Sequence, residues 1–137
     1  MAADQVVGPV FPGLTVEELD PAALRRLACE LESDALARSI AQTYLRMLDA
    51  RLTRAAAALE CCDEVAAMDV LLSLRVSSAT VGLVRLESAV RWVIDAVRRG
   101  EPELAHERGS SMLGLAAGAR LALRSHLEHT VAAAAPV

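Results

Sequence analysis

Histidine is the first side chain to consider for chemistry in this chain of 137 residues. His126 and His129 are three positions apart, so on a helix both imidazoles would lie on one face and could bind a single metal ion. No obvious third ligand accompanies them, and exposed histidines on a terminal helix are the simpler interpretation. His106 stands apart from both. We therefore expect no metal site and no cofactor.

Cysteine and serine offer equally little. An odd number of cysteines, without a secretory signal, argues against a disulfide framework. The adjacent Cys61 and Cys62 could be a redox pair, but a small apolar pair near a helix end is the interpretation that we prefer. Ser77 and Ser78 have no histidine at a suggestive position to activate them. With no phosphate loop and no catalytic triad, we expect that the chain is not an enzyme.

The composition indicates which elements must carry these residues. Hydrophobic residues make up 54% of the chain and aromatic residues only 2%, so the core must be aliphatic, which favours packed helices. The net charge is -4 and no basic block is present, so a nucleic-acid partner is not expected. No apolar run reaches about 18 residues, and the N-terminus lacks a positive region before an apolar one. We therefore expect a cytoplasmic protein with no membrane association.

Helical periodicity divides the chain into five stretches, in which apolar residues recur at spacings of three and four. Asp20, Asp34 and Asp63 are expected to cap the first three helices, and Gly82 to end the third. The fourth helix stops at Gly100. The last covers about 103–128, with a weakened stretch near Gly109. The second helix should face the core with a stripe that includes Leu36, Ile40, Tyr44 and Leu48.

These elements predict an all-α fold. Short links between amphipathic helices are typical of an antiparallel four-helix bundle, here with a short additional N-terminal helix. Residues 1–14 are expected to form an irregular N-terminal arm, residues 15–128 the helical bundle, and residues 129–137 a flexible C-terminal tail. Glu17 and Glu18 are expected to be solvated near a helix end. Trp92 lies off the main stripe of the fourth helix, at the edge of the core or on a binding surface.

The third predicted helix contains the segment "LSLRVSSATVG", and with the order of the helices it resembles the histidine phosphotransfer (HPt) domains of bacterial phosphorelays. The resemblance covers about residues 16–127. The family motif has the form His-x-Leu-Lys-Gly-Ser/Ala, with a glycine several residues later. Leu74, Arg75 and Ser77 match its leucine, lysine and small residue, and Gly82 matches the later glycine. The resemblance implies an HPt-type bundle and a role in two-component signal transduction.

The chain departs from the family at the centre of the motif. The phosphoacceptor histidine falls on Leu72, and the motif glycine falls on Val76. Leucine has no lone pair, so it cannot hold a phosphoryl group. Val76 lies one helical turn beyond Leu72 and fills the room that a glycine would leave. Both changes indicate a pseudo-HPt protein.

This register predicts a second, outward apolar stripe on the third helix. Leu72 should be largely exposed, and the stripe comprises Met68, Leu72, Val76 and Ala79, flanked by Arg75. Such a patch on a small domain often marks a protein-binding site. The expected partner is a response-regulator receiver domain or a histidine kinase. Two alternatives remain open, which are an active phosphotransfer protein that uses His106, His126 or His129, and a homo-oligomeric module that associates through the stripe.

Overall fold

The computed structural model describes residues 17–134, with side chains up to Thr130. The described residues form helices and no strand, so the all-α prediction is confirmed. The predicted arm, residues 1–14, lies outside the described residues. The helices are α2 (Ala22–Leu31), α3 (Asp34–Glu60), α4 (Glu64–Val81), α5 (Val84–Arg98), α6 (Pro102–Leu113) and α7 (Ala116–Ala134).

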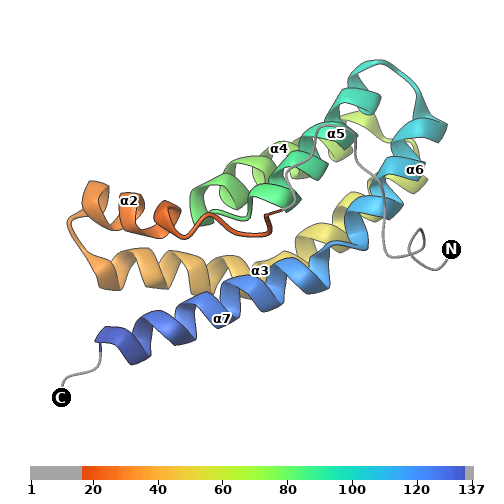
Figure 1. Cartoon of the computed structure of the whole chain (residues 1–137). Coiled ribbons are helices and arrows are strands. Elements are labelled where there is room, and N and C mark those ends of the chain that lie inside the picture. Colours follow the sequence, from red (N-terminus) through yellow and green to blue (C-terminus); the bar gives the residue numbers. More distant parts are fainter. Residues whose placement is uncertain (1–16, 135–137) are drawn as a thin grey trace, which may run out of the picture.

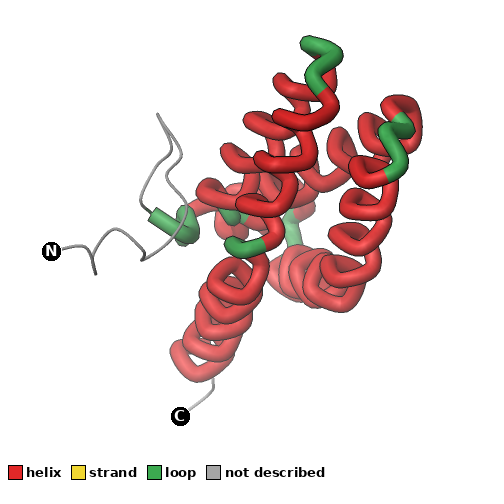
Figure 2. The backbone as a smooth tube through the Cα atoms, turned by 90° about the vertical axis from the view of Figure 1, so that its right-hand side faces the viewer, coloured by secondary structure: helices red, strands yellow, loops and turns green. Residues whose placement is uncertain are grey.

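The helices pack around one aliphatic core. α4 packs against both α3 and α5, α5 packs against α6, and α6 returns to α3. Short turns join consecutive helices, and Figure 2 shows these loops at the ends of the helical rods. α2 packs on the first half of α3, and α7 extends beyond α6 along the same half (Figure 1). The long α3 therefore connects the two ends of the molecule.

Side-chain caps begin two of the central helices. The Ser33 hydroxyl accepts a hydrogen bond of 3.0 Å from the backbone N–H of Leu36, so the cap of α3 is one residue earlier than the predicted Asp34. The predicted cap of α4 is confirmed, because Asp63 Oδ1 accepts a bond of 3.1 Å from the N–H of Ala66. These caps fix where α3 and α4 start.

Gly82 ends α4, as predicted, and also fixes the beginning of α2. Its φ of +87° is a left-handed conformation that favours glycine. A Cβ at this position would lie 2.6 Å from the carbonyl oxygen of Asp20 and 2.7 Å from Cβ of Ala23. The Asp20 N–H donates a hydrogen bond of 2.8 Å to the Gly82 carbonyl. The segment before α2 is therefore bound directly to the α4–α5 turn.

The last predicted helix is interrupted, but not where the sequence suggested. Gly109 lies inside α6 and is buried against Leu59, whose Cδ1 would be 2.6 Å from a Cβ at this position. The break falls instead at residues 114–115, between α6 and α7. α7 continues to Ala134, so the boundary predicted at residue 128 falls within a helix.

The inward face of α3 differs from the predicted stripe over its first two turns. Ala37 and Ala41 are buried, whereas Leu36 and Ile40 are 54% and 39% exposed. The prediction was therefore wrong for these two residues, although Tyr44 is buried as expected. α2 packs against α3, and a face that carries small alanines can be buried against a neighbouring helix at close range.

Candidate functional site

The predicted stripe on α4 is exposed at one end and half-buried at the other. Val76 is 65% exposed, and Ala79 is exposed beside it. Met68 and Leu72 are half-buried and pack against the core. The expectation that Leu72 is largely exposed was therefore wrong. The stripe is therefore partly covered at Met68 and Leu72 and open to solvent at Val76 and Ala79.

Arg75, the residue that matches the motif lysine, is directed toward α5. Its Nε lies 3.8 Å from a carboxylate oxygen of Glu87, and the same oxygen accepts a contact of 3.1 Å from Arg91. Glu87 is mostly buried from solvent, so the pair is less screened than an ordinary surface pair. Arg75 therefore contributes to packing between α4 and α5 and borders the stripe on that side.

A groove with apolar side chains lies between α3 and α4, and sequence reasoning missed it. It has a volume of about 510 Å³. Its apolar side chains come from both helices, with Val76 shared between this groove and the predicted stripe. The groove is lined on α3 by residues between Ser39 and Arg51, among them Ile40, Thr43 and Met47, and on α4 by residues that include Ser73, Val76, Ser77 and Thr80.

Two hydroxyl groups on the α4 wall of the groove donate hydrogen bonds within α4. Ser77 Oγ donates a hydrogen bond of 2.8 Å to the Ser73 carbonyl, and Thr80 Oγ1 donates one of 2.9 Å to the Val76 carbonyl. Because their protons are used in this way, these side chains make few polar demands on an occupant. The α4 wall consequently behaves as a weakly polar surface around Val76.

A buried hydrogen bond joins α3 and α4, the two helices that form the walls of the groove. The hydroxyl groups of Tyr44 on α3 and Ser78 on α4 are 2.8 Å apart and buried. Burial raises the pKa of Tyr44 to about 12, and the bond to Ser78 opposes part of that increase. Ser78 was predicted to face inward, and this is confirmed. The groove is thus built on a fixed junction between α3 and α4.

A signal for this groove was present in the sequence. Leu36, Ile40 and Met47 are spaced by four and seven residues, which places them on one face of a helix. A neighbouring face carries Ala37 and Ala41, which also count as apolar. Two apolar stripes therefore compete on α3, and periodicity alone selects the larger side chains rather than the alanines that face the core.

The three histidines lie on α6 and α7, away from the groove lining. His106 and His129 are exposed, whereas His126 is half-buried. Burial lowers the pKa of His126, and Arg25 and Arg38 lower it further, which favours a neutral imidazole. In the described part of the chain, no group of three His, Cys, Asp or Glu side chains is arranged to hold a metal ion. The histidines are therefore not assembled into one site.

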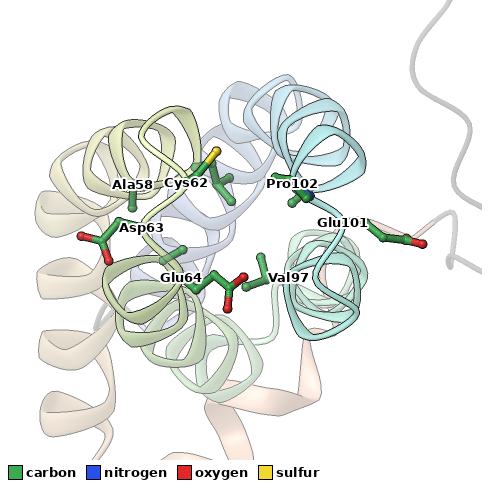
Figure 3. A pocket seen from close by; sticks show the side chains of 10 residues that line it. Ala58, Cys62, Asp63, Glu64, Val97, Glu101 and Pro102 are labelled. Atoms are coloured by element: carbon green, nitrogen blue, oxygen red, sulfur yellow. The ribbon is translucent and has the colours of Figure 1, made fainter.

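Cys61 and Cys62 lie at the α3–α4 turn, as the sequence predicted for a pair near a helix end. Both are exposed and free, and Cys62 adopts a left-handed φ of 56°. Cys62 borders a small cavity of about 90 Å³ between this turn and the α5–α6 turn. Figure 3 shows Val97 directed into this cavity and Glu101 directed away from it. The cavity is too small for an organic cofactor.

Trp92 lies at the edge of the core, which is one of the two positions that the sequence allowed. It is half-buried and packs against the core cluster. The guanidinium of Arg108, on α6, lies 4.7 Å from the centre of its ring and also donates a bond of 2.9 Å to the Trp92 carbonyl. The stacking and the hydrogen bond attach α6 to α5.

Glu18 is not the solvated side chain that the sequence suggested. Its Oε2 atom is buried and has no hydrogen-bond partner among the described residues. A Cβ added at Gly118 of α7 would lie 3.2 Å from Oε1. Burial raises the pKa of Glu18, and the positive charge of Arg85 on α5 opposes part of that increase. The segment before α2 therefore lies against both α5 and α7.

Comparison with known proteins gives no relative for this arrangement. No protein-family model matches the chain, and no curated protein or solved structure matches it significantly. None of the described helices is both long and apolar enough to cross a membrane.

Proposed function

We propose that the protein is a non-catalytic, HPt-like adaptor of a bacterial two-component phosphorelay in the cytoplasm. In this proposal α3, α4, α5 and α6 correspond to the antiparallel four-helix bundle of the HPt type, with α2 as the short additional N-terminal helix. The adaptor binds a response-regulator receiver domain or a histidine kinase through the outward surface of α4. That surface comprises Met68, Leu72, Arg75, Val76 and Ala79.

The observation that carries the proposal is the side chain at the phosphoacceptor position. Leu72 has no nucleophilic atom and is half-buried against the core. The chain's histidines are on α6 and α7, whereas the motif-like segment is on α4. A surface that keeps the family's helix but not its nucleophile can bind a partner without accepting a phosphoryl group.

Two further features support binding rather than transfer. Val76 projects from α4 with 65% of its surface exposed, so it offers an apolar contact where the family has a glycine. Arg75 is already paired with Glu87 of α5, so its charge is partly neutralised before any phosphoryl group approaches. Both features adapt the surface to a stable protein contact.

The test measures binding and phosphoryl transfer separately. Receiver domains and histidine kinases encoded near this protein's gene would be immobilised, and binding would be followed by biolayer interferometry. Transfer would be followed as acid-labile phosphate on the chain after incubation with a phosphorylated receiver. We expect binding without transfer. Val76→Glu should abolish binding, because it places a charge in an apolar contact.

Val65→Glu is the matched control, since Val65 is on the same helix and is 82% exposed. It should bind as the unchanged protein does. Acid-labile phosphate on His106, His126 or His129 would show instead an active phosphotransfer protein with a displaced acceptor. Sedimentation would identify a homo-oligomeric module if the protein associates with itself, if Val76→Glu removes this association, and if neither a receiver domain nor a kinase binds.

A further inference from the structure

We propose that the groove between α3 and α4 binds an amphipathic helix of another protein, and that this helix carries an acidic side chain beside its apolar stripe. The inference goes beyond the proposed function, because it concerns the α3 wall and the chemistry of the occupant. It does not depend on the resemblance to phosphotransfer domains.

The length of the groove defines the size of its occupant. Its lining residues on α3 extend from Ser39 to Arg51, which is about 18 Å at 1.5 Å per residue. A parallel or antiparallel helix of about three turns has the same length. Such a helix presents one apolar side chain per turn, at positions i, i+3 or i+4, and i+7.

The walls of the groove suit apolar anchors. Ile40 and Met47 project from α3, and Val76 projects from α4 across from them. Methionine is flexible and polarisable, so Met47 can adjust to the shape of an incoming side chain. The hydroxyl protons of Ser77 and Thr80 are already donated to carbonyl groups of α4. Burying this wall therefore leaves no unpaired hydroxyl proton at these two residues.

The charge of the groove specifies the polar part of the occupant. The chain has a net charge of -4, but none of the groove's lining residues is acidic. Arg51 closes one end, and its guanidinium donates only to neutral groups, which are Ser77 Oγ at 3.2 Å and Met47 Sδ at 3.8 Å. Arg46 is nearby and donates to Thr43 Oγ1 of the lining.

The positive charge at this end of the groove favours a carboxylate on the bound helix. Among the described residues, no carboxylate forms an ion pair with Arg51 or Arg46. A carboxylate on the occupant would make charge-assisted hydrogen bonds with Arg51 in a partly desolvated groove. A second copy docked groove to groove would bring no carboxylate to that end, because the lining has none. The absence of a carboxylate in the lining favours a different protein as the occupant, and binding by a second copy is one of the outcomes of the test.

The test selects binders without assuming a partner. A displayed library of helix-forming peptides of 14 residues would be selected on the folded full-length protein, with Val76→Glu as the counter-selection. Enriched sequences should combine apolar residues at i, i+3 or i+4, and i+7 with Asp or Glu at one end. One selected peptide would then be synthesised and titrated into isotopically labelled protein. The NMR signals of the methyl groups of Ile40, Met47 and Val76 should shift.

Charge reversal tests the electrostatic part. Arg51→Glu should weaken the binding of the selected acidic peptide about tenfold or more. Replacing the acidic residue of the peptide by lysine should restore binding to this variant. Arg54→Glu is the matched control, because Arg54 is exposed on α3 but is not part of the groove lining. It should change binding little. Thermal unfolding would verify that each variant is folded.

Four results would overturn the proposal. The first is no enrichment over the counter-selected variant, and the second is enrichment without a preference for acidic residues. The third is equal weakening by Arg51→Glu and Arg54→Glu. Concentration-dependent dimerisation that Val76→Glu removes would also overturn it, by assigning the groove to a second copy of the chain.

Discussion

Replacing Tyr44 by phenylalanine removes one partner of the buried hydrogen bond between α3 and α4 and leaves the other. Ser78 is fully buried, and its hydroxyl would then lack the Tyr44 partner at 2.8 Å. We expect a loss of about 1–3 kcal/mol in the free energy of unfolding. Ser78→Ala leaves the Tyr44 hydroxyl unpaired and should cost a similar amount. The double variant replaces both groups with apolar ones of nearly the same shape, so it should lose less than the two single variants together.

Urea unfolding of the four proteins measures this coupling directly. The pH dependence gives a second measurement. The folded pKa of Tyr44 is about 12, above the value of 10.0 for the unfolded chain, so the folded state holds this proton more tightly. The associated stability, on the order of 2–3 kcal/mol, is fully present below pH 10 and is lost as the pH rises toward 12.

Tyr44→Phe should lack this alkaline loss. Additive effects of the two single substitutions, or an unchanged alkaline profile in Tyr44→Phe, would refute the reasoning. The first result would mean that the two hydroxyl groups do not interact. The second would mean that the phenol is not buried in the folded protein.

Three more predictions concern the α4 surface and the segment before α2. Leu74→Ala should lower the free energy of unfolding by about 2–5 kcal/mol, whereas Val76→Glu should change it by less than about 0.5 kcal/mol. Chemical unfolding of both variants measures this, and the reverse order would mean that the helical register of α4 is wrong. Leu72→His alone should not produce efficient phosphotransfer, because Val76 crowds the new imidazole. Adding Val76→Gly should increase the transfer rate. Full activity in the single variant would contradict the crowding by Val76. Burial raises the pKa of Glu18, so the stability of the protein should fall as the pH rises above the ordinary pKa of 4.5. Glu18→Gln should flatten this part of the plot of stability against pH. An unchanged plot in this variant would mean that the carboxyl group is solvated.

The sequence was sufficient to predict the bounds of α4 because the signals at its two ends are local. Asp63 begins α4 and Gly82 ends it, and each acts through hydrogen bonds within a few residues. Ser78 and Leu74 were placed inward correctly, on the same face of α4 as Ala67 and Leu71, and all four side chains are buried. Such features need no knowledge of the neighbouring helices.

The site was harder to predict because it depends on which helix covers which face. Leu36 and Ile40 form as good a stripe as the alanines beside them, and the helices that pack on α3 decide that the alanines are buried. Leu72 is similar, because packing against the core determines its exposure rather than its place in the helical period. The break after α6 was misplaced for the same reason, since Gly109 is used for close packing against Leu59.

The contact between Asp20 and Gly82 has a consequence for the order in which the molecule assembles. The α4–α5 turn is closed by bonds between neighbouring residues, such as Leu83 N–H to the Ser78 carbonyl at 2.9 Å, and is complete without α2. The segment before α2 instead needs that finished turn, which is 62 positions away along the chain (20 to 82). Contacts between distant positions form late in folding and can open without global unfolding. The bond between Asp20 and Gly82 therefore needs the turn to be in place, and breaking it would release the segment before α2 while the hydrogen bonds within the turn stay intact.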